Sequence, residues 1–441
     1  MSLANRLEKS ARGLALKILE EVFQEGAYSN LALKRGLSGS SLSQQDKALV
    51  TELVYGTVAR KITLEWQLAH VIEDRDKLES WVYTLLMLSL YQLLYLDKIP
   101  SHAVLNEAVE LAKSRSQRGA DKLVNAVLRK LSKGPLADPA SIKRQNKRYS
   151  VQYSLPVWLV KKTIDQYGHE RAIKIFESLF VRNKASVRVT NPAKLAEIQA
   201  ATGAKRSLLS PVGLVKESGY FAGTKYFEDG DLTIQDESSQ LVAPTLKLQG
   251  QEQVLDACAA PGGKTAHLAS YLTSGQVLAL DLYDHKLDLI KENARRLHVA
   301  DRVRTKKLDA RLVHQEFAPN SFDKILVDAP CSGIGLIRRK PDIKYKKASQ
   351  DFESLQKIQF DILKSVCQTL RKNGIITYST CTIFREENQD LIQKFLEAHP
   401  NFEQVKLEHR QEDILTDGFI QITPELHLTD GFFIAQLKRV Y

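Results

Sequence analysis

The chain has 441 residues, which is too long for a single hydrophobic core, so two or three domains are expected. Hydrophobic residues make up 43% and charged residues 26%, as in ordinary folded soluble proteins. The net charge of +11 suits a polyanionic partner, and four cysteines in so long a chain exclude a disulfide framework. No Cys or His spacing is typical of a zinc site, so no metal is expected.

The longest apolar run, residues 85–96, is interrupted by two polar residues. It is too short to cross a bilayer and predicts a buried helix. The residues that follow Met1 include Glu8 and Lys9 and lack the apolar core of a secretory signal. We therefore expect a cytoplasmic protein without a membrane partner, and we expect it to act as a monomer.

Residues 1–142 are predicted to form an all-helical domain. Leu14, Ile18 and Val22 repeat at helical spacing, and Gly and Pro residues between 134 and 139 end the block.

A basic stretch extends from Lys113 to Arg148, across the end of this domain. Its basic residues are Lys113, Arg115, Arg118, Lys122, Arg129, Lys130, Lys133, Lys143, Arg144, Lys147 and Arg148. Only Asp121 and Asp138 oppose them. A solvated helix face joined to a charged linker would have this composition, but we favour a surface that follows nucleic-acid phosphates.

Residues 143–232 are predicted to form a small α+β domain that links the two larger ones and contributes to RNA binding. Helices are expected after Pro156 and over 172–180, and a strand is expected over 186–189. The Gly- and Tyr-rich end of this segment indicates hairpins.

From residue 233 to residue 441, short runs of apolar residues alternate with helical sequence. These runs are 254–255, 277–280, 325–327 and 375–378. Buried strands that alternate with helices indicate a doubly wound α/β domain, in which helices cover both faces of a mostly parallel sheet.

The segment 254–265 is predicted to be a strand, a tight turn of small residues and the start of a helix. Small residues let the backbone approach a ligand closely, and a helix N-terminus offers free N–H groups. Lys264 and Thr265 match the end of a nucleotide phosphate loop, but that loop requires Gly where Cys258 stands. Dinucleotide binding stays open, although the G-x-G-x-x-G pattern is absent.

Acidic residues follow the next two predicted strands. Asp281 ends the second strand, where an acid in a nucleotide-binding unit accepts hydrogen bonds from ribose hydroxyls. The third strand leads to Asp309, at the place expected to meet an adenine amino group. Each residue alone could cap a helix, but acids at successive strand ends favour a bound nucleoside.

Two cysteines come directly after the fourth and fifth predicted strands. Cys331 follows Asp328 after two residues, and Cys381 follows Thr380. Both lie past the carboxyl end of a parallel strand, at the edge where ligands bind in this architecture, and this placement indicates thiol chemistry. Cys367, by contrast, lies among apolar residues at helical spacing and is predicted to be core.

Methylation of carbon 5 of a pyrimidine needs such groups, because that carbon is a poor nucleophile. A thiolate that adds to carbon 6 enables carbon 5 to attack a methyl sulfonium, and a carboxyl group near N3 assists the addition. A base must then remove the carbon 5 proton so that the thiol can leave. Asp328 and the two cysteines supply these groups, and the target base must be unstacked to reach them.

These motifs match a known family. The runs concerned are 235–239, 256–265 (DACAAPGGKT), 328–333 (DAPCSG) and 380–381. They resemble motifs of the Nop/Sun family of RNA cytosine methyltransferases. Residues 45–48 and 52–57 resemble an antitermination-factor (NusB-type) RNA-binding domain. This pairing is similar to that of a bacterial methyltransferase of 16S ribosomal RNA, and the resemblance covers essentially the whole chain.

The resemblance implies a Rossmann-like domain that uses S-adenosyl-L-methionine to methylate a cytosine in 16S ribosomal RNA. The residues assigned to the methionine and ribose part of the cofactor are Cys258, Ala259, Ala260, Pro261, Gly262, Gly263 and Lys264. Asp281 would hold the ribose, Asp309 the adenine, and Asp328 would border both the cofactor and the cytosine. The need for an unstacked base favours naked or early-assembly RNA as the substrate.

The family takes its nucleophile from the Thr-Cys motif, here Cys381, and gives Cys331 a role in product release. One alternative is a DNA cytosine methyltransferase, which would use Cys331 as the nucleophile. The other is a non-catalytic RNA-binding assembly factor. The Thr-Cys motif and the NusB-type segment argue against the first, and the intact catalytic residues argue against the second. Two basic runs, Arg338 to Lys340 and Lys344 to Lys347, could hold RNA phosphates at the pocket mouth.

Overall fold

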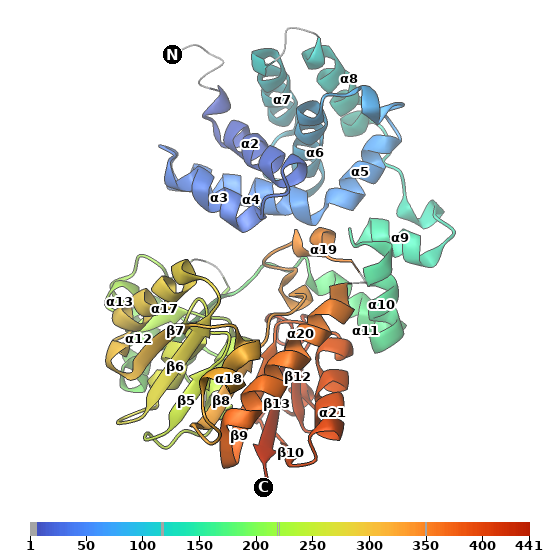
Figure 1. Cartoon of the computed structure of the whole chain (residues 1–441). Helices are drawn as coiled ribbons and strands as arrows, with labels where there is room; N and C mark the ends of the chain where they lie inside the picture. The colour runs from blue at the N-terminus through green and yellow to red at the C-terminus, as the bar shows by residue number, and fades with distance from the viewer. Residues whose placement is uncertain (1–6, 116–118, 218, 220, 349–350) are drawn as a thin grey trace. The chain divides into compact units, whose positions relative to one another are not determined.

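The computed structural model describes residues 7–115, 119–217, 219, 221–348 and 351–441 (Figure 1). Arg118 of the predicted basic stretch lies outside these residues. The chain divides into two compact units. The helical unit contains the chain up to Phe176 together with Arg339–Lys346, and the sheet unit contains Glu177–Arg338 and Lys347–Tyr441. The boundaries of the three domains expected from the sequence stay a prediction.

The helical unit confirms the all-helical prediction for the N-terminal region. Its helices are α2 (Ala11–Gln24), α3 (Ser29–Ser38), α4 (Gln44–Ala59), α5 (Lys61–Ala69), α6 (Ser80–Tyr95), α7 (Ser101–Arg115), α8 (Ala120–Lys133), α9 (Gln145–Gln152), α10 (Val157–Tyr167) and the start of α11 (His169–Ser178). α6 is the buried helix that the apolar run predicted. Ser43 caps α4, because its hydroxyl oxygen accepts a hydrogen bond from the backbone N–H of Asp46 at 3.1 Å.

α4 and α6 approach each other closely at one glycine. The phenol of Tyr91 crosses α4 at Gly56 and donates a hydrogen bond to the carboxylate of Glu52. A Cβ at position 56 would lie 1.9 Å from the Cζ of Tyr91, which is far inside van der Waals contact. Position 56 therefore requires glycine because of the neighbouring ring.

Part of the helical unit comes from far along the chain. Residues 339–346, which include α19 (Ile343–Lys346), pack among the N-terminal helices. Asp342 accepts a hydrogen bond from Ser29, and the hydroxyl of Tyr345 donates one to the carbonyl of Val58 at 3.0 Å. The chain therefore passes between the two units at three places, after residues 176, 338 and 346.

The prediction that the two basic runs hold RNA phosphates is wrong for Arg338 and Lys344. Lys344 is buried and donates to the carbonyl of Ala59 at 2.7 Å, and burial lowers the pKa of its ammonium well below the ordinary value. Arg338 is also buried, and it donates to the carbonyls of Pro424 and Thr429 in the sheet unit. Both side chains donate to buried carbonyl groups and are not available to a phosphate.

The sheet unit opens with a small antiparallel sheet. Its strands, in the order β2-β3-β1-β4, are β2 (Lys205–Arg206), β3 (Gly213–Lys216), β1 (Ala185–Val189) and β4 (Leu232–Ile234). α12 (Leu195–Thr202) contributes Leu195 and Ile198 to the core of this sheet. The strand predicted over 186–189 is confirmed. The hairpin prediction is confirmed for β2 and β3 only, because the short helix α13 (Lys225–Glu228) follows in the Gly- and Tyr-rich segment and β3 and β4 are not neighbours in the sheet.

In the described residues the larger sheet has nine strands. They are β5 (Gln253–Asp256), β6 (Gln276–Asp281), β7 (Val303–Lys307), β8 (Phe322–Asp328), β9 (Leu370–Thr380), β10 (Phe402–Val405), β11 (Leu415–Thr416), β12 (Phe419–Ile422) and β13 (Phe432–Arg439). Five neighbours, in the order β7-β6-β5-β8-β9, run parallel. β13 pairs antiparallel with β9, and β10 and β12 pair with β13.

Helices cover both faces of this sheet. Alternate residues of β5, Leu255 and Val254, belong to two separate apolar cores. The helices are α20 (Asp351–Val366) and α21 (Gln389–Ala398) in the first core, and α16 (Gly263–Ala269) and α17 (Asp284–Arg296) in the second. Cys367 is buried in the first core, as predicted. The doubly wound α/β prediction is therefore confirmed.

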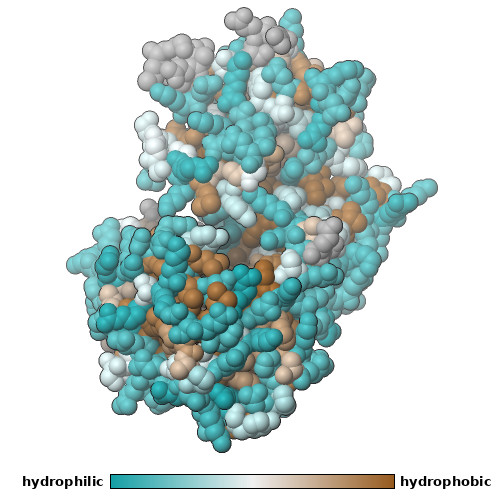
Figure 2. Space-filling model, in the orientation of Figure 1, coloured by the Kyte–Doolittle hydropathy of each residue, from teal (hydrophilic) through white to brown (hydrophobic). Residues whose placement is uncertain are grey.

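The surface is mainly polar on the face that Figure 2 shows, with hydrophobic side chains in smaller patches. None of the helices in the described part of the chain combines the length and the apolar character that a bilayer crossing needs.

We predict that Gly56→Ala lowers the unfolding free energy by about 1–3 kcal/mol, because the new methyl group forces Tyr91 away from α4 and from Glu52. Urea unfolding of the full chain measures the change. Gly39→Ala is the matched control, because a Cβ at Gly39 meets no atom within 4 Å. Equal stability of both variants and the wild type would contradict the packing argument.

Candidate active site

Two cavities adjoin one another at the carboxyl ends of the parallel strands. The first, of about 290 Å³, is lined by Gln235, Asp236, Lys264, Leu336, Cys381 and Phe432, among others. The second, of about 370 Å³, is lined by Asp281, Leu282, Asp309, Ile358 and Ile362, among others. Both include Cys258, Ala260 and Asp328 in their walls, so a ligand in one cavity would be next to a ligand in the other. The strand order reverses at β5, which lies between β6 and β8, and ligands bind at such a position in open α/β sheets.

The predicted cofactor loop connects β5 to α16 and forms walls of both cavities. Gly262 has a φ of +99°, and a Cβ there would lie 2.9 Å from the Cα of Ile290, so both the backbone conformation and the packing require glycine. At Gly263 a Cβ would meet no atom within 4 Å, which leaves open space beside the first cavity. Ala259 donates its N–H to the carbonyl of Leu280 at 2.9 Å and so ties the loop to β6.

Lys264 and Asp328 form an ion pair of 2.7 Å, which the sequence analysis did not foresee. The other oxygen of Asp328 accepts a hydrogen bond from the hydroxyl of Ser379 at 2.8 Å. Burial alone would lower the pKa of Lys264, but Asp328 and a negative charge on Cys381 raise it above the ordinary value. Lys264 therefore stays charged, 5.2 Å from the centre of the Phe432 ring.

The two predicted catalytic cysteines lie together. Their sulfur atoms are 3.3 Å apart, and neither is in a disulfide. The hydrogen bond with Cys381, burial and the nearby carboxylate of Glu387 raise the pKa of Cys331 well above the ordinary value. A thiol in that environment is protonated at neutral pH, and it can share its hydrogen with a neighbouring thiolate.

The third cysteine of the site behaves differently. Burial and the acidic groups around it, Asp256 first, raise the pKa of the Cys258 thiol. Its place in both cavity walls and its protonated state suit contact with a ligand, not nucleophilic attack.

Asp281 and Asp309, the two acids expected at successive strand ends, both line the second cavity, but their surroundings differ. Asp281 ends β6, and one of its oxygens accepts a hydrogen bond from the N–H of Tyr283 at 3.2 Å and pairs with the ammonium of Lys286 at 3.7 Å. Asp309 is already bound by the side chain of Arg311, at 2.6–3.0 Å, and this pairing lowers the pKa of its carboxyl group. Asp281 is therefore the more available acceptor of the two.

Two further wall residues were given no role in the sequence analysis, although Asp236 lies in the run 235–239 that carries part of the resemblance. Phe432 begins β13, whose antiparallel pairing with β9 brings it to the first cavity. Asp236 caps the short helix α14 (Glu237–Gln240), because one of its oxygens accepts from the N–H and hydroxyl of Ser238. The same oxygen accepts from Thr429, close to Phe432 in sequence, so two distant segments meet at this wall.

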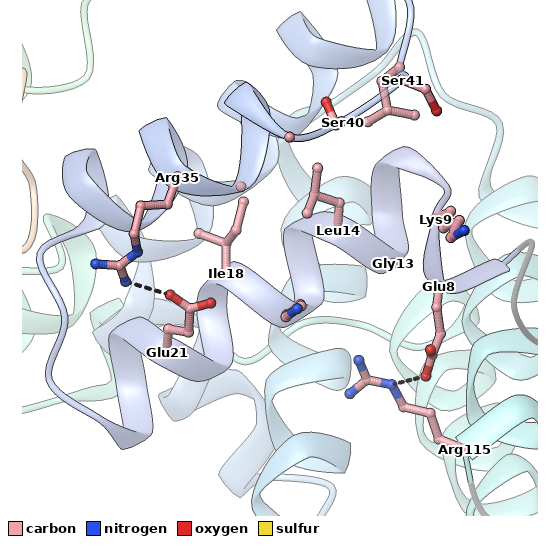
Figure 3. A pocket seen from close by; sticks show the side chains of 14 residues that line it. Glu8, Lys9, Gly13, Leu14, Ile18, Glu21, Arg35, Ser40, Ser41 and Arg115 are labelled. Atoms are coloured by element: carbon pink, nitrogen blue, oxygen red, sulfur yellow. Dashed lines mark hydrogen bonds and ion pairs between the residues drawn. The ribbon is translucent and has the colours of Figure 1, made fainter.

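A third cavity lies in the helical unit and lacks comparable chemistry. It has a volume of about 580 Å³ and adjoins α2, α3 and the chain that follows α3 (Figure 3). Two of its cations already face acids, Arg35 with Glu21 at 2.7 Å and Arg115 with Glu8 at 3.6 Å. In the described ranges no group of three or more His, Cys, Asp or Glu side chains could hold a metal ion.

Comparisons with known proteins agree with this arrangement. A family model described as 16S rRNA methyltransferase RsmB/F matches residues 243–438, and a NusB family model matches residues 9–133. A probable ribosomal RNA small subunit methyltransferase B from Bacillus subtilis (strain 168) is 42% identical over 98% of this chain and 99% of its own. A probable protein of the same name from Synechocystis sp. is 32% identical over 98% and 99%. The crystal structure of PH0851, which is 24% identical, covers 97% of this chain and 98% of its own with a TM-score of 0.82.

Asp256, the last residue of β5, should make the stability of the protein depend on pH. Burial raises its pKa from 3.8 to about 7, although Thr265 donates a hydrogen bond to it at 2.7 Å. Because the folded-state pKa is the higher one, the contribution of this group to the unfolding free energy decreases as pH rises from about 4 to about 7. Asp256→Asn cannot lose this proton, so it should gain stability relative to the wild type over that window, by at most about 1.4 kcal/mol per pH unit. Urea unfolding at several pH values measures the difference, and a difference that does not vary with pH would contradict the buried titration.

Proposed function

The chain belongs to the RsmB/F family of 16S rRNA methyltransferases, and we propose that it methylates carbon 5 of a cytosine in small-subunit (16S) ribosomal RNA. The methyl donor would be S-adenosyl-L-methionine and the intermediate a covalent bond between Cys381 and carbon 6. The observation that carries this proposal is the pair of sulfur atoms 3.3 Å apart, beside the Lys264–Asp328 ion pair. A ribosomal RNA substrate implies an enzyme of the cytoplasm.

The second cavity fits the cofactor in its chemistry. Asp281 is an available acceptor for ribose hydroxyls, and Leu282, Ile358 and Ile362 give apolar walls of the kind that an adenine ring needs. The open space at Gly263 leaves room for a methionine chain that extends toward the first cavity. When it is bound, the cofactor supplies an electrophilic methyl group on a sulfonium.

The first cavity fits the cytosine. The thiolate of Cys381 would form a bond to carbon 6, and the electron pair of the 5,6 double bond would move onto carbon 5 and the ring. Lys264 and Asp328 border this cavity and would stabilise the ring by hydrogen bonding near N3. The ring of Phe432 adds an apolar surface for an unstacked base.

Cys331 would act after methylation. The hydrogen bond with Cys381 is the largest cause of its raised pKa, and a sulfur of Cys381 that is bonded to carbon 6 carries no negative charge. The pKa of Cys331 therefore falls at the step that needs a base, and its proton passes to solvent. Cys331 then takes the proton from carbon 5, the 5,6 double bond re-forms, and Cys381 leaves as a thiolate.

The RNA-binding surface would include the basic stretch from Lys113 to Arg148. The residues of this stretch that are exposed and have no ion pair in the described part of the chain are Lys122, Arg129, Lys130, Lys133, Lys143, Arg144 and Lys147. Lys113 and Arg115 are paired with Glu110 and Glu20, each at 2.8 Å. The contact with phosphates should therefore concentrate on α8 and on the chain that leads to α9.

The two cysteines can be told apart by the order in which they act. Cys381→Ala should abolish turnover and form no covalent adduct with RNA. Cys331→Ala should still attack and methylate but release slowly, so that a protein–RNA complex accumulates and survives a denaturing gel in the presence of cofactor. A trapped complex in Cys381→Ala instead would exchange the two roles, as in a DNA cytosine methyltransferase. Adducts in neither variant would refute the covalent route.

A further inference from the structure

Glu387 holds the chain on both sides of Cys331. It lies in a short 3₁₀ turn (Arg385–Glu387) after Cys381, and its side chain is completely buried. Its carboxylate accepts hydrogen bonds from the N–H and the hydroxyl of Ser332, at 2.8 and 2.6 Å. The amide of Gln359 donates to the same carboxylate at 3.0 Å and to the carbonyl of Pro330 at 2.9 Å. Residues 330 and 332 are thus both connected to one carboxylate.

Asn388 holds the chain on both sides of Cys381 in the same way. It is also completely buried. Its side-chain oxygen accepts a hydrogen bond from the hydroxyl of Thr380 at 2.6 Å, and its amide donates to the carbonyl of Thr382 at 3.1 Å. Two residues that are adjacent in sequence therefore each position one of the two thiols.

Further contacts join the two arrangements. The hydroxyl oxygens of Ser332 and Thr382 are 2.9 Å apart, and the phenol of Tyr378 donates to the carbonyl of Glu387 at 2.7 Å. The N–H of Gly335 donates to the carbonyl of Cys381 at 3.0 Å. The loops that carry the two cysteines are thereby connected through side chains as well as through the sheet.

The burial of Glu387 costs free energy of folding, which points to a function for this arrangement. A buried carboxylate loses its hydration, and in the described part of the chain Glu387 has hydrogen bonds but no ion pair to offset that loss. Neither Glu387 nor Asn388 lines the two cavities of the site, so neither is placed to contact cytosine or cofactor. The negative charge of Glu387 is one of the causes of the raised pKa of Cys331.

We propose that Glu387 and Asn388 are the positioning residues of the two thiols, Glu387 for Cys331 and Asn388 for Cys381. Together they set the separation of the sulfur atoms and keep the attacking and the releasing thiol distinct. The assignment of these two roles rests on the proposed function, whereas the positioning itself can be measured without RNA or cofactor.

Two isosteric substitutions test the proposal in the full-length protein. Glu387→Gln removes a negative charge beside Cys331, so the pH midpoint for alkylation of Cys331 by iodoacetamide should fall by about one unit, and that of Cys381 should stay. Asn388→Asp adds a negative charge beside Cys381, so the midpoint of Cys381 should rise by about one unit, and that of Cys331 should stay. Peptide mapping assigns the label to each cysteine. Thr245→Val is the control, because it removes a buried contact of 3.0 Å with Thr377 on β9 and should move neither midpoint.

The reaction gives a second readout. Gln359→Leu breaks the connection to Pro330 and leaves the charge of Glu387 in place, so it should form the RNA adduct at the wild-type rate but accumulate it. Asn388→Asp should form the adduct at least about tenfold more slowly, the effect of a barrier higher by 1.4 kcal/mol. If Glu387→Gln does not fold, the accumulation in Gln359→Leu still tests the positioning of Cys331. Midpoints that move together in each variant, or not at all, would overturn the assignment of one residue to one thiol. Separate midpoint shifts without any methylation would support the positioning and refute the proposed function.

Discussion

β8 and β9 pair in parallel with Asp328 beside Ser379, and the N–H of Ala329 extends the pairing by one bond of 2.9 Å to the carbonyl of Ser379. Cys331 and Cys381 follow this last contact within two residues on each strand. A slip of register by one residue would point one of the side chains to the opposite face of the sheet. The distance between the two sulfur atoms therefore depends on the register of β8 and β9 and, as we propose above, on the side chains of Glu387 and Asn388.

The site contains buried charged groups, and each of them acts on a neighbouring side chain. Lys264 stays charged because Asp328 and Cys381 face it. The carboxylate of Glu387 is one of the causes that raise the pKa of Cys331. The two thiols are in contact but have different charged neighbours, because Lys264 faces Cys381 whereas Glu387 lies near Cys331. In water these charges would act weakly, whereas burial strengthens them.

Much of this could be predicted from the sequence, because it depends on local patterns. Short apolar runs predicted β5, β6, β8 and β9. Because ligands bind at the carboxyl ends of parallel strands, the sequence also predicted that Cys331 and Cys381 lie at one edge of the sheet. Phe432, Glu387 and Asn388 could not be found in this way, because their positions depend on antiparallel pairing with β13 and on tertiary hydrogen bonds. The burial of Lys344 was missed for a related reason: a basic run has the same composition on a surface as in an interior that offers carbonyl groups.

We propose that the two adjoining cavities together carry out the methylation of carbon 5 of cytosine in ribosomal RNA. Purified protein, isotopically labelled S-adenosyl-L-methionine and 16S ribosomal RNA transcribed in vitro allow a direct measurement, in which the RNA is digested to nucleosides and analysed by mass spectrometry. We expect the label to appear in 5-methylcytidine, and we expect duplex DNA to stay unlabelled. Label in a different nucleoside of the RNA, or in the DNA, would contradict the proposal.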